Sequence, residues 1–139
     1  MTSERSHDQL VIVSSSQSFE QACHALEAAI PQQGFGLLGS HDLGGTLRAK
    51  GIDFKEKCRI FEVCQPQQAA AVLERDMRLN MALPCRLSVY SEAGQTRIGM
   101  ISPVAMLGGL SSDAALVATA TEVERSLRAI IESAAEPTA

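Results

Sequence analysis

The C-terminal part of the chain repeats an apolar side chain at every third or fourth position. The positions are Leu116, Ala120, Val123, Leu127, Ile130 and Ala134. This spacing places them on one face of a long α-helix, and Ser111 or Ser112 is expected to cap its N-terminus. Because a helix with a single apolar face buries that face against a second layer, the rest of the chain has to supply that layer.

Five upstream segments have the short apolar or alternating pattern of β-strands. They span residues 10–13, 35–40, 59–64, 85–90 and 96–101. The last two flank the turn residues Ala93 and Gly94, so they are predicted to form an antiparallel hairpin. The first contains only apolar residues, which predicts a strand buried on both faces or at the seam of a dimer.

Two helices are predicted between these strands. Ser18 and Gln21 form a capping box at the start of the first helix, which places Cys23 on its inner face. Pro66 suits the first turn of the second helix, where its missing N–H costs nothing. The inner face of this second helix is predicted to comprise Ala69, Ala70, Leu73 and Met77.

The remaining elements are weaker. Asp42 is expected to cap a short helix at residues 43–50, and residues 105–109 read as an apolar loop. Strands and helices follow one another without regular β-α-β alternation. This order predicts an α+β fold of two layers, with an antiparallel or mixed sheet and helices packed on one face. We expect a single domain over residues 1–139, with an ordered core from about residue 9 to residue 134.

Composition excludes several classes of protein. The chain has 139 residues, of which 45% are hydrophobic, and this is enough for one domain with a core. A net charge of −4 argues against nucleic acid as a partner. The four cysteines are too sparse for a disulfide-stapled secreted domain. No segment approaches the roughly 18 apolar residues of a membrane helix, so a cytoplasmic protein with reduced thiols is expected.

Several short motifs occur in a fixed order along most of the chain. They are Gly34-Phe35-Gly36-Leu37-Leu38 with His41-Asp42-Leu43, Leu47-Arg48-Ala49-Lys50-Gly51, Cys64-Gln65-Pro66, Leu83-Pro84-Cys85-Arg86 and the loop Pro103-Val104-Ala105-Met106-Leu107. Together they resemble the domain-of-unknown-function family 302, and the likeness extends from about Phe19 to Ile131.

The resemblance implies a TATA-binding-protein-like α+β fold of the order β-α-β(4)-α, often dimeric. It carries no established activity and does not imply DNA binding. The family has an asparagine before the proline of its first cysteine motif, whereas this chain has Gln65 before Pro66. Glutamine is a poorer helix cap than asparagine, so the loop at Cys64 is expected to be held differently here.

Cys64 and Cys85 are the main candidates for chemistry, because each stands beside a proline at a predicted strand–helix junction. We expect the two strand ends, and hence the two thiols, to lie close together. The N-terminus of the helix at Pro66 would favour a thiolate at Cys64, and Arg86 would add to this effect if it reaches the site. The alternative is that both cysteines are small packing residues in tight corners.

The sequence offers two further candidate sites, one for a metal ion and one for a small molecule. Cys64, Cys85, His41 and Asp42 could supply mixed metal ligands, but their spacing matches no zinc pattern, so no metal is expected. A small-molecule pocket between the sheet and the last helix would have an apolar lining. Its candidate residues are Pro66, Met100, Met106 and Leu107.

The leading functional hypothesis is a small cytoplasmic binding or accessory domain that forms a homodimer. The dimer is expected because residues 10–13 and 105–107 offer more apolar surface than one small domain covers. The alternatives are a thiol-dependent redox or sulfur-handling protein that uses Cys64 and Cys85, and a small-ligand pocket beside the last helix. The sequence names neither a cofactor nor a ligand, and it leaves open whether the chain is an enzyme.

Overall fold

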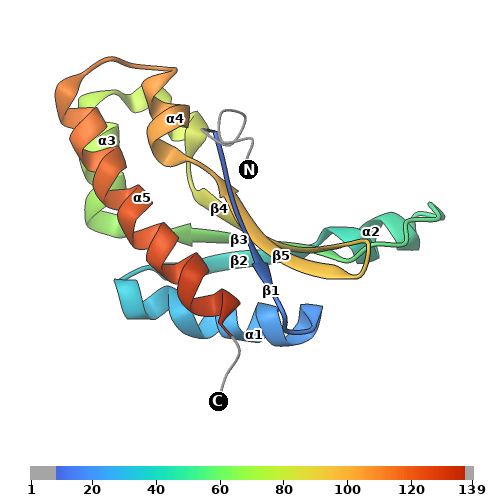
Figure 1. The fold of residues 1–139 in the computed structure, drawn as a ribbon. Helices are drawn as coiled ribbons and strands as arrows, with labels where there is room; N and C mark the ends of the chain where they lie inside the picture. The colour runs from blue at the N-terminus through green and yellow to red at the C-terminus, as the bar shows by residue number, and fades with distance from the viewer. Residues whose placement is uncertain (1–8, 137–139) are drawn as a thin grey trace.

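A computed structural model describes residues 9–136, which contain one five-stranded sheet in the order β1-β5-β4-β3-β2 (Figure 1). Every neighbouring pair of strands is antiparallel. The strands are β1 (Leu10–Ser15), β2 (Gly36–Asp42), β3 (Cys58–Cys64), β4 (Cys85–Glu92) and β5 (Gln95–Ile101). The predicted α+β class is confirmed, and the sheet is antiparallel rather than mixed.

The helices pack on one side of this open sheet, where the long α5 crosses it beside α1 (Figure 1). They are α1 (Phe19–Ala29), α2 (Leu43–Ala49), α3 (Pro66–Arg75), α4 (Pro103–Gly108) and α5 (Ala114–Ala135), with short 3₁₀ helices η2 (Ile30–Gln33) and η3 (Met77–Ala82). One strand, one helix, four strands and a last helix agree with the expected order, and α2, α3 and α4 are additions to it. None of the helices within residues 9–136 is long and apolar enough to cross a membrane.

The apolar face of α5 is buried as the periodicity predicts. All six predicted positions are inaccessible, and Leu127 is only 1% exposed. Leu127 lies in one buried cluster with Phe61 and Ile98 of the sheet. The predicted N-cap is wrong by one or two residues, since the carboxylate of Asp113 accepts the N–H of Ala115 at 2.8 Å. A carboxylate directly before the helix takes this role ahead of the serine hydroxyls.

Other local signals are confirmed. Ser18 and Gln21 form the capping box of α1, and Asp42 caps α2 by accepting the N–H of Gly45 at 2.9 Å. Glu92 pairs with Gln95 around Ala93 and Gly94, whose φ angles are 53° and 82°. Positive φ at both turn residues is the hairpin geometry that matches strand twist.

Residues 10–13 are not buried on both faces. Leu10 and Ile12 are 44% and 42% exposed, whereas the alternate residue Val11 is buried. The reason is that β1 lies at the edge of a sheet whose helices, within the described residues, cover one face only.

Two further expectations are corrected. The predicted loop at residues 105–109 is largely helix α4, which Ser102 caps by accepting the N–H of Ala105 at 3.1 Å. The predicted inner face of α3 is right only at Ala69 and Leu73, which line a cavity. It misses the buried Val72, and Ala70 and Met77 are exposed, Met77 at 64%. Met77 lies outward because α3 ends at Arg75 and the chain continues in a different helix type, η3.

Candidate functional site

The sheet brings Cys64 and Cys85 together at one end of β3 and β4. Val63 pairs with Cys85 across these strands, and Cys64 is the next residue along β3. Strand spacing and rise therefore place the Cα atoms of the two cysteines roughly 6 Å apart. Strict alternation would turn Cys64 to the opposite face, but the chain leaves the sheet there for α3. Both cysteines line the same cavity.

We call this cavity, which has a volume of about 280 Å³, the thiol cavity. Its walls come from α3, the segment before β4, α4 and α5. Apolar side chains dominate the lining, among them Ala69, Val72, Met106, Leu107 and Val123. Within residues 9–136, no charged side chain and no histidine lines it. The thiol cavity therefore presents apolar surface and sulfur atoms rather than charge.

The turn that carries Cys64 is held by Gln65. The Gln65 Oε1 atom accepts the N–H of Gln68 at 2.7 Å, and its Nε2 atom donates to Gln67 Oε1 at 2.7 Å. Glutamine thus serves as the cap of α3, contrary to the expectation from its propensity. The extended backbone of Gln65, with φ −109° and ψ 109°, lets its longer side chain turn back onto the helix.

Burial controls the state of the Cys85 thiol. Desolvation raises the pKa of Cys85 to about 11, and the neighbouring Cys64 acts in the same direction. A thiol with this pKa is protonated and weakly nucleophilic at neutral pH. All four cysteines are free.

Arg86 does not line the thiol cavity, although it borders a smaller cavity of about 80 Å³ together with Cys85 and Met106. It follows Cys85 on β4, so alternation turns its side chain to the other face of the sheet. There Arg86 is largely exposed, with its Nη2 atom 4.0 Å from a carboxylate oxygen of Glu62. The expectation that Arg86 assists Cys64 therefore has no geometric support.

The mixed metal set is not assembled either. Asp42 pairs with Arg59 at one end of β3, whereas Cys64 pairs with Gly36 at the other end. The His41 Nε2 atom lies 3.3 Å from a carboxylate oxygen of Glu62. In the described part of the chain, no group of three or more His, Cys, Asp or Glu residues is placed to hold a metal ion.

The proposed pocket residues divide into two groups. Met106 and Leu107 line the thiol cavity. Met100 is instead buried in the main core, and Pro66 is exposed at the start of α3. Sequence reasoning missed Val72 as a wall of the cavity. The available signal was its position three residues after Ala69, which places both on one helix face.

The chain is similar to known proteins in both sequence and fold. A family model described as "Domain of unknown function DUF302" matches residues 11–134. The crystal structure of an uncharacterized conserved protein DUF302 from Bacillus stearothermophilus is similar at a TM-score of 0.85 and 38% sequence identity, covering 90% of this chain and 97% of that chain. No curated protein matches the chain. The family match covers both cysteine motifs and all of the sheet except Leu10, and the chain belongs to the DUF302 family.

Proposed function

We propose that the chain is a binding domain that holds a small ligand in the thiol cavity and has no catalytic activity of its own. The observation that carries the proposal is the cavity itself, formed where the two cysteine–proline motifs meet. Its volume of about 280 Å³ is near the lower limit for small-molecule sites. It is larger than the cavity of about 150 Å³ that holds benzene in an engineered protein.

The alternative of a thiol-dependent enzyme fits the site less well. A catalytic cysteine needs a stabilised thiolate, and burial raises the pKa of Cys85 to about 11, which argues against Cys85 as the nucleophile. No cationic side chain within residues 9–136 lines the cavity to offset this effect. In a reducing cytoplasm both thiols would stay unoxidised, so no disulfide between Cys64 and Cys85 would alter the cavity.

Filling the cavity tests the proposal. We expect toluene to shift the amide NMR signals of cavity residues in the unmodified protein, because a cavity lined mainly by apolar side chains takes up small apolar molecules. Ala69→Phe places a ring in the cavity wall and should abolish these shifts. Ala70→Phe is the matched control, because Ala70 is the next residue of α3 and is exposed.

The two variants also separate blocking from unfolding. Both proteins should keep the dispersed NMR spectrum of the parent chain, and only Ala69→Phe should lose the toluene response. An unmodified protein that gives no response at millimolar toluene would contradict the proposed binding cavity. Equal responses in the parent and in Ala69→Phe would place the binding elsewhere.

We also propose that two copies associate through β1. Within residues 9–136 β1 pairs only with β5, so its outer edge is free to pair with another strand. The opposite edge strand, β2, has an irregularity between Leu37 and Gly39 and ends in His41 and Asp42. Bulges and charges protect an edge from pairing, and β1 has neither.

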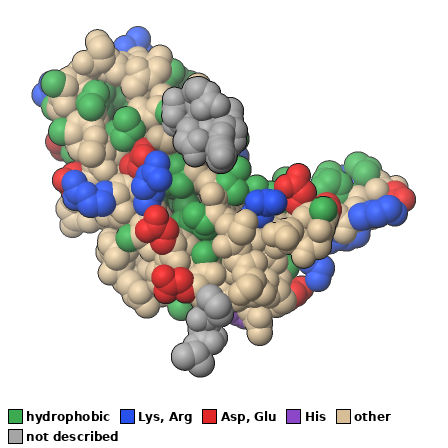
Figure 2. Space-filling model, viewed as in Figure 1, with side chains coloured by type: hydrophobic (Ala, Val, Ile, Leu, Met, Phe, Trp, Pro, Cys, Tyr) green, Lys and Arg blue, Asp and Glu red, His purple; other side chains and the backbone are tan. Residues whose placement is uncertain are grey.

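A groove beside β1 supports the same interface. We call this hollow of about 770 Å³ the β1 groove, and its apolar residues include Leu10, Ile12 and Val104. Glu124 and Arg128 of α5 lie on its rim. Figure 2 shows apolar side chains in this hollow with acidic and basic side chains beside them. Both charge signs on one patch suit a second copy in a two-fold arrangement.

Light scattering at micromolar concentration should give the mass of a dimer. Ile12→Lys should shift the protein toward the monomer, because it puts a charge on the proposed seam. Leu38→Lys is the matched control, since Leu38 is 62% exposed on the opposite edge strand. A monomer mass for the parent chain, or dissociation by Leu38→Lys alone, would refute the β1 interface.

A further inference from the structure

We propose that the thiol cavity binds one Cu(I) ion through the sulfur atoms of Cys64, Cys85 and Met106. This inference rests on the proposed function and names the class of ligand. All three residues line the same cavity. Soft thiolate and thioether ligands favour Cu(I), Zn²⁺ and iron–sulfur clusters over the other common biological metals.

The remaining lining of the cavity excludes other ions. Mg²⁺ and Ca²⁺ need several oxygen ligands, and within residues 9–136 no carboxylate lines the cavity. Structural Zn²⁺ sites use four ligands, drawn mainly from cysteine and histidine. The cavity offers only two cysteines and no histidine among the described residues. A structural Zn²⁺ site would lack its fourth ligand here, and the thioether of Met106 is a soft ligand of the kind that Cu(I) takes.

The backbone holds the two cysteines within reach of one ion. Their Cα atoms are roughly 6 Å apart on neighbouring strands. Met106 approaches from α4, and together with Cys85 it also lines a smaller adjoining cavity of about 80 Å³. The donors therefore come from the ends of two strands and from one helix.

Binding of Cu(I) makes the site negatively charged, and the N-terminus of α3 stabilises that charge. Each thiol releases its proton to solvent as it ligates the ion, so two thiolates and Cu(I) together carry one negative charge. The N-terminus of α3 begins beside Cys64, and the helix dipole favours negative charge at this end. Gln65 and Gln68, from the first turn of α3, both lie in the cavity wall.

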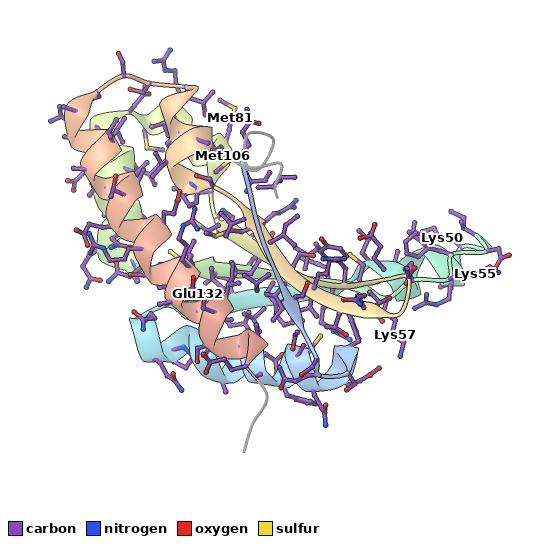
Figure 3. All side chains as sticks on the ribbon, in the orientation of Figure 1. Lys50, Lys55, Lys57, Met81, Met106 and Glu132 are labelled. Atoms are coloured by element: carbon purple, nitrogen blue, oxygen red, sulfur yellow. The ribbon has the colours of Figure 1, made fainter. Side chains whose placement is uncertain are left out.

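A second methionine marks a path from the surface. Met81 of η3 is 81% exposed and shares an open groove with Met106. Figure 3 shows Met81 and Met106 at the same end of the molecule. Met106 lines both this groove and the thiol cavity. A soft ion could therefore pass from Met81 to Met106 and then to the two thiols.

The test is an anaerobic titration of the reduced full chain with Cu(I) in competition with bicinchoninate. We expect one tightly bound ion per chain and X-ray absorption that shows only sulfur ligands. Cys64→Ser combined with Cys85→Ser should abolish binding. Met106→Leu, which nearly keeps the side-chain volume, should weaken binding by about 10-fold or more, because it removes one of the three sulfur ligands. Cys58→Ser and Met100→Leu are controls and should bind as the parent does, since neither residue lines the cavity.

A measurement on the unmodified chain covers the case in which the double serine variant does not fold. Bound Cu(I) should protect Cys64 from alkylation while Cys58 stays reactive. Full Cu(I) binding by the double variant, equal alkylation of Cys64 with and without Cu(I), or equal affinity for Zn²⁺ would overturn the inference. Binding of toluene without binding of Cu(I) would refute the copper site and leave the proposed cavity function intact. The absence of both would refute both.

Discussion

Leu127→Ala is expected to lower the free energy of unfolding by about 2–5 kcal/mol, the usual cost of truncating a buried leucine. Leu127 lies on α5 and is 1% exposed. Its side chain belongs to the cluster that joins this helix to Phe61 and Ile98 of the sheet. Truncation removes apolar contacts with both layers and leaves a cavity between them, so the loss exceeds that of an exposed position.

Urea unfolding followed by circular dichroism measures this loss. Leu110→Ala provides a control with the same chemistry, because Leu110 is 59% exposed beyond α4. It should change the free energy of unfolding by no more than about 0.5 kcal/mol. If Leu127→Ala costs as little as this control, the apolar face of α5 is not the main seam between the layers.

The elements with strong local signals could be predicted from sequence. The stripe through Leu127 fixed the buried face of α5, because helical spacing alone determines which side chains share a face. The pair Ser18 and Gln21 fixed the start of α1, since both bonds of a capping box form within one turn. Ala93 and Gly94 fixed the hairpin by the same local logic.

The elements that depend on distant contacts could not be predicted. Helix α4 reads as a loop because it is short and ends in glycine. Its first turn is held by Glu124 of the next helix, 20 residues after Val104. The inner face of α3 was misassigned because alanines on several sides make its pattern ambiguous, and only packing selects Val72.

The candidate site was predictable in outline only. The convergence of Cys64 and Cys85 follows from strand ends that meet across an antiparallel pair, and the two cysteines do line one cavity. Arg86 was expected near Cys64, but successive side chains of a strand point to opposite faces of the sheet, so Arg86 lies on the face opposite to Cys85. The cavity itself depends on how α3, α4 and α5 pack around the strand ends, and no local pattern contains that information.

Glu124 is the polar contact that ties α4 to α5. Its side chain is only 14% exposed. Its carboxylate accepts hydrogen bonds from the Ser102 hydroxyl, from the Val104 N–H at 3.1 Å and from Arg128 Nε at 3.0 Å. Burial acts to raise the pKa of Glu124, but the hydrogen bonds from Ser102, Val104 and Arg128 outweigh it and hold the pKa below its ordinary value.

Glu124→Gln is expected to lower the free energy of unfolding at pH 7 by about 1–3 kcal/mol, because a neutral amide cannot satisfy all three donors. The pH dependence has a definite sign. A carboxyl whose pKa is lower in the folded state than in the unfolded state stabilises the fold above its unfolded pKa, near 4.3, and loses this effect as pH falls through the folded value. The loss caused by Glu124→Gln should therefore shrink when unfolding is measured below about pH 4.

Urea unfolding of both proteins between pH 7 and pH 3 checks this expectation. Glu122→Gln is the matched control, since Glu122 is 56% exposed on the same helix and pairs with Arg125 at 2.7 Å. An exposed pair of this kind contributes little, so the control should stay within about 0.5 kcal/mol of the parent at every pH. A difference between the parent and Glu124→Gln that stays constant down to pH 3 would show that the charge of Glu124 is not what holds α4. The contact would then stabilise the fold through packing, and α4 should stay docked against α5 in acid.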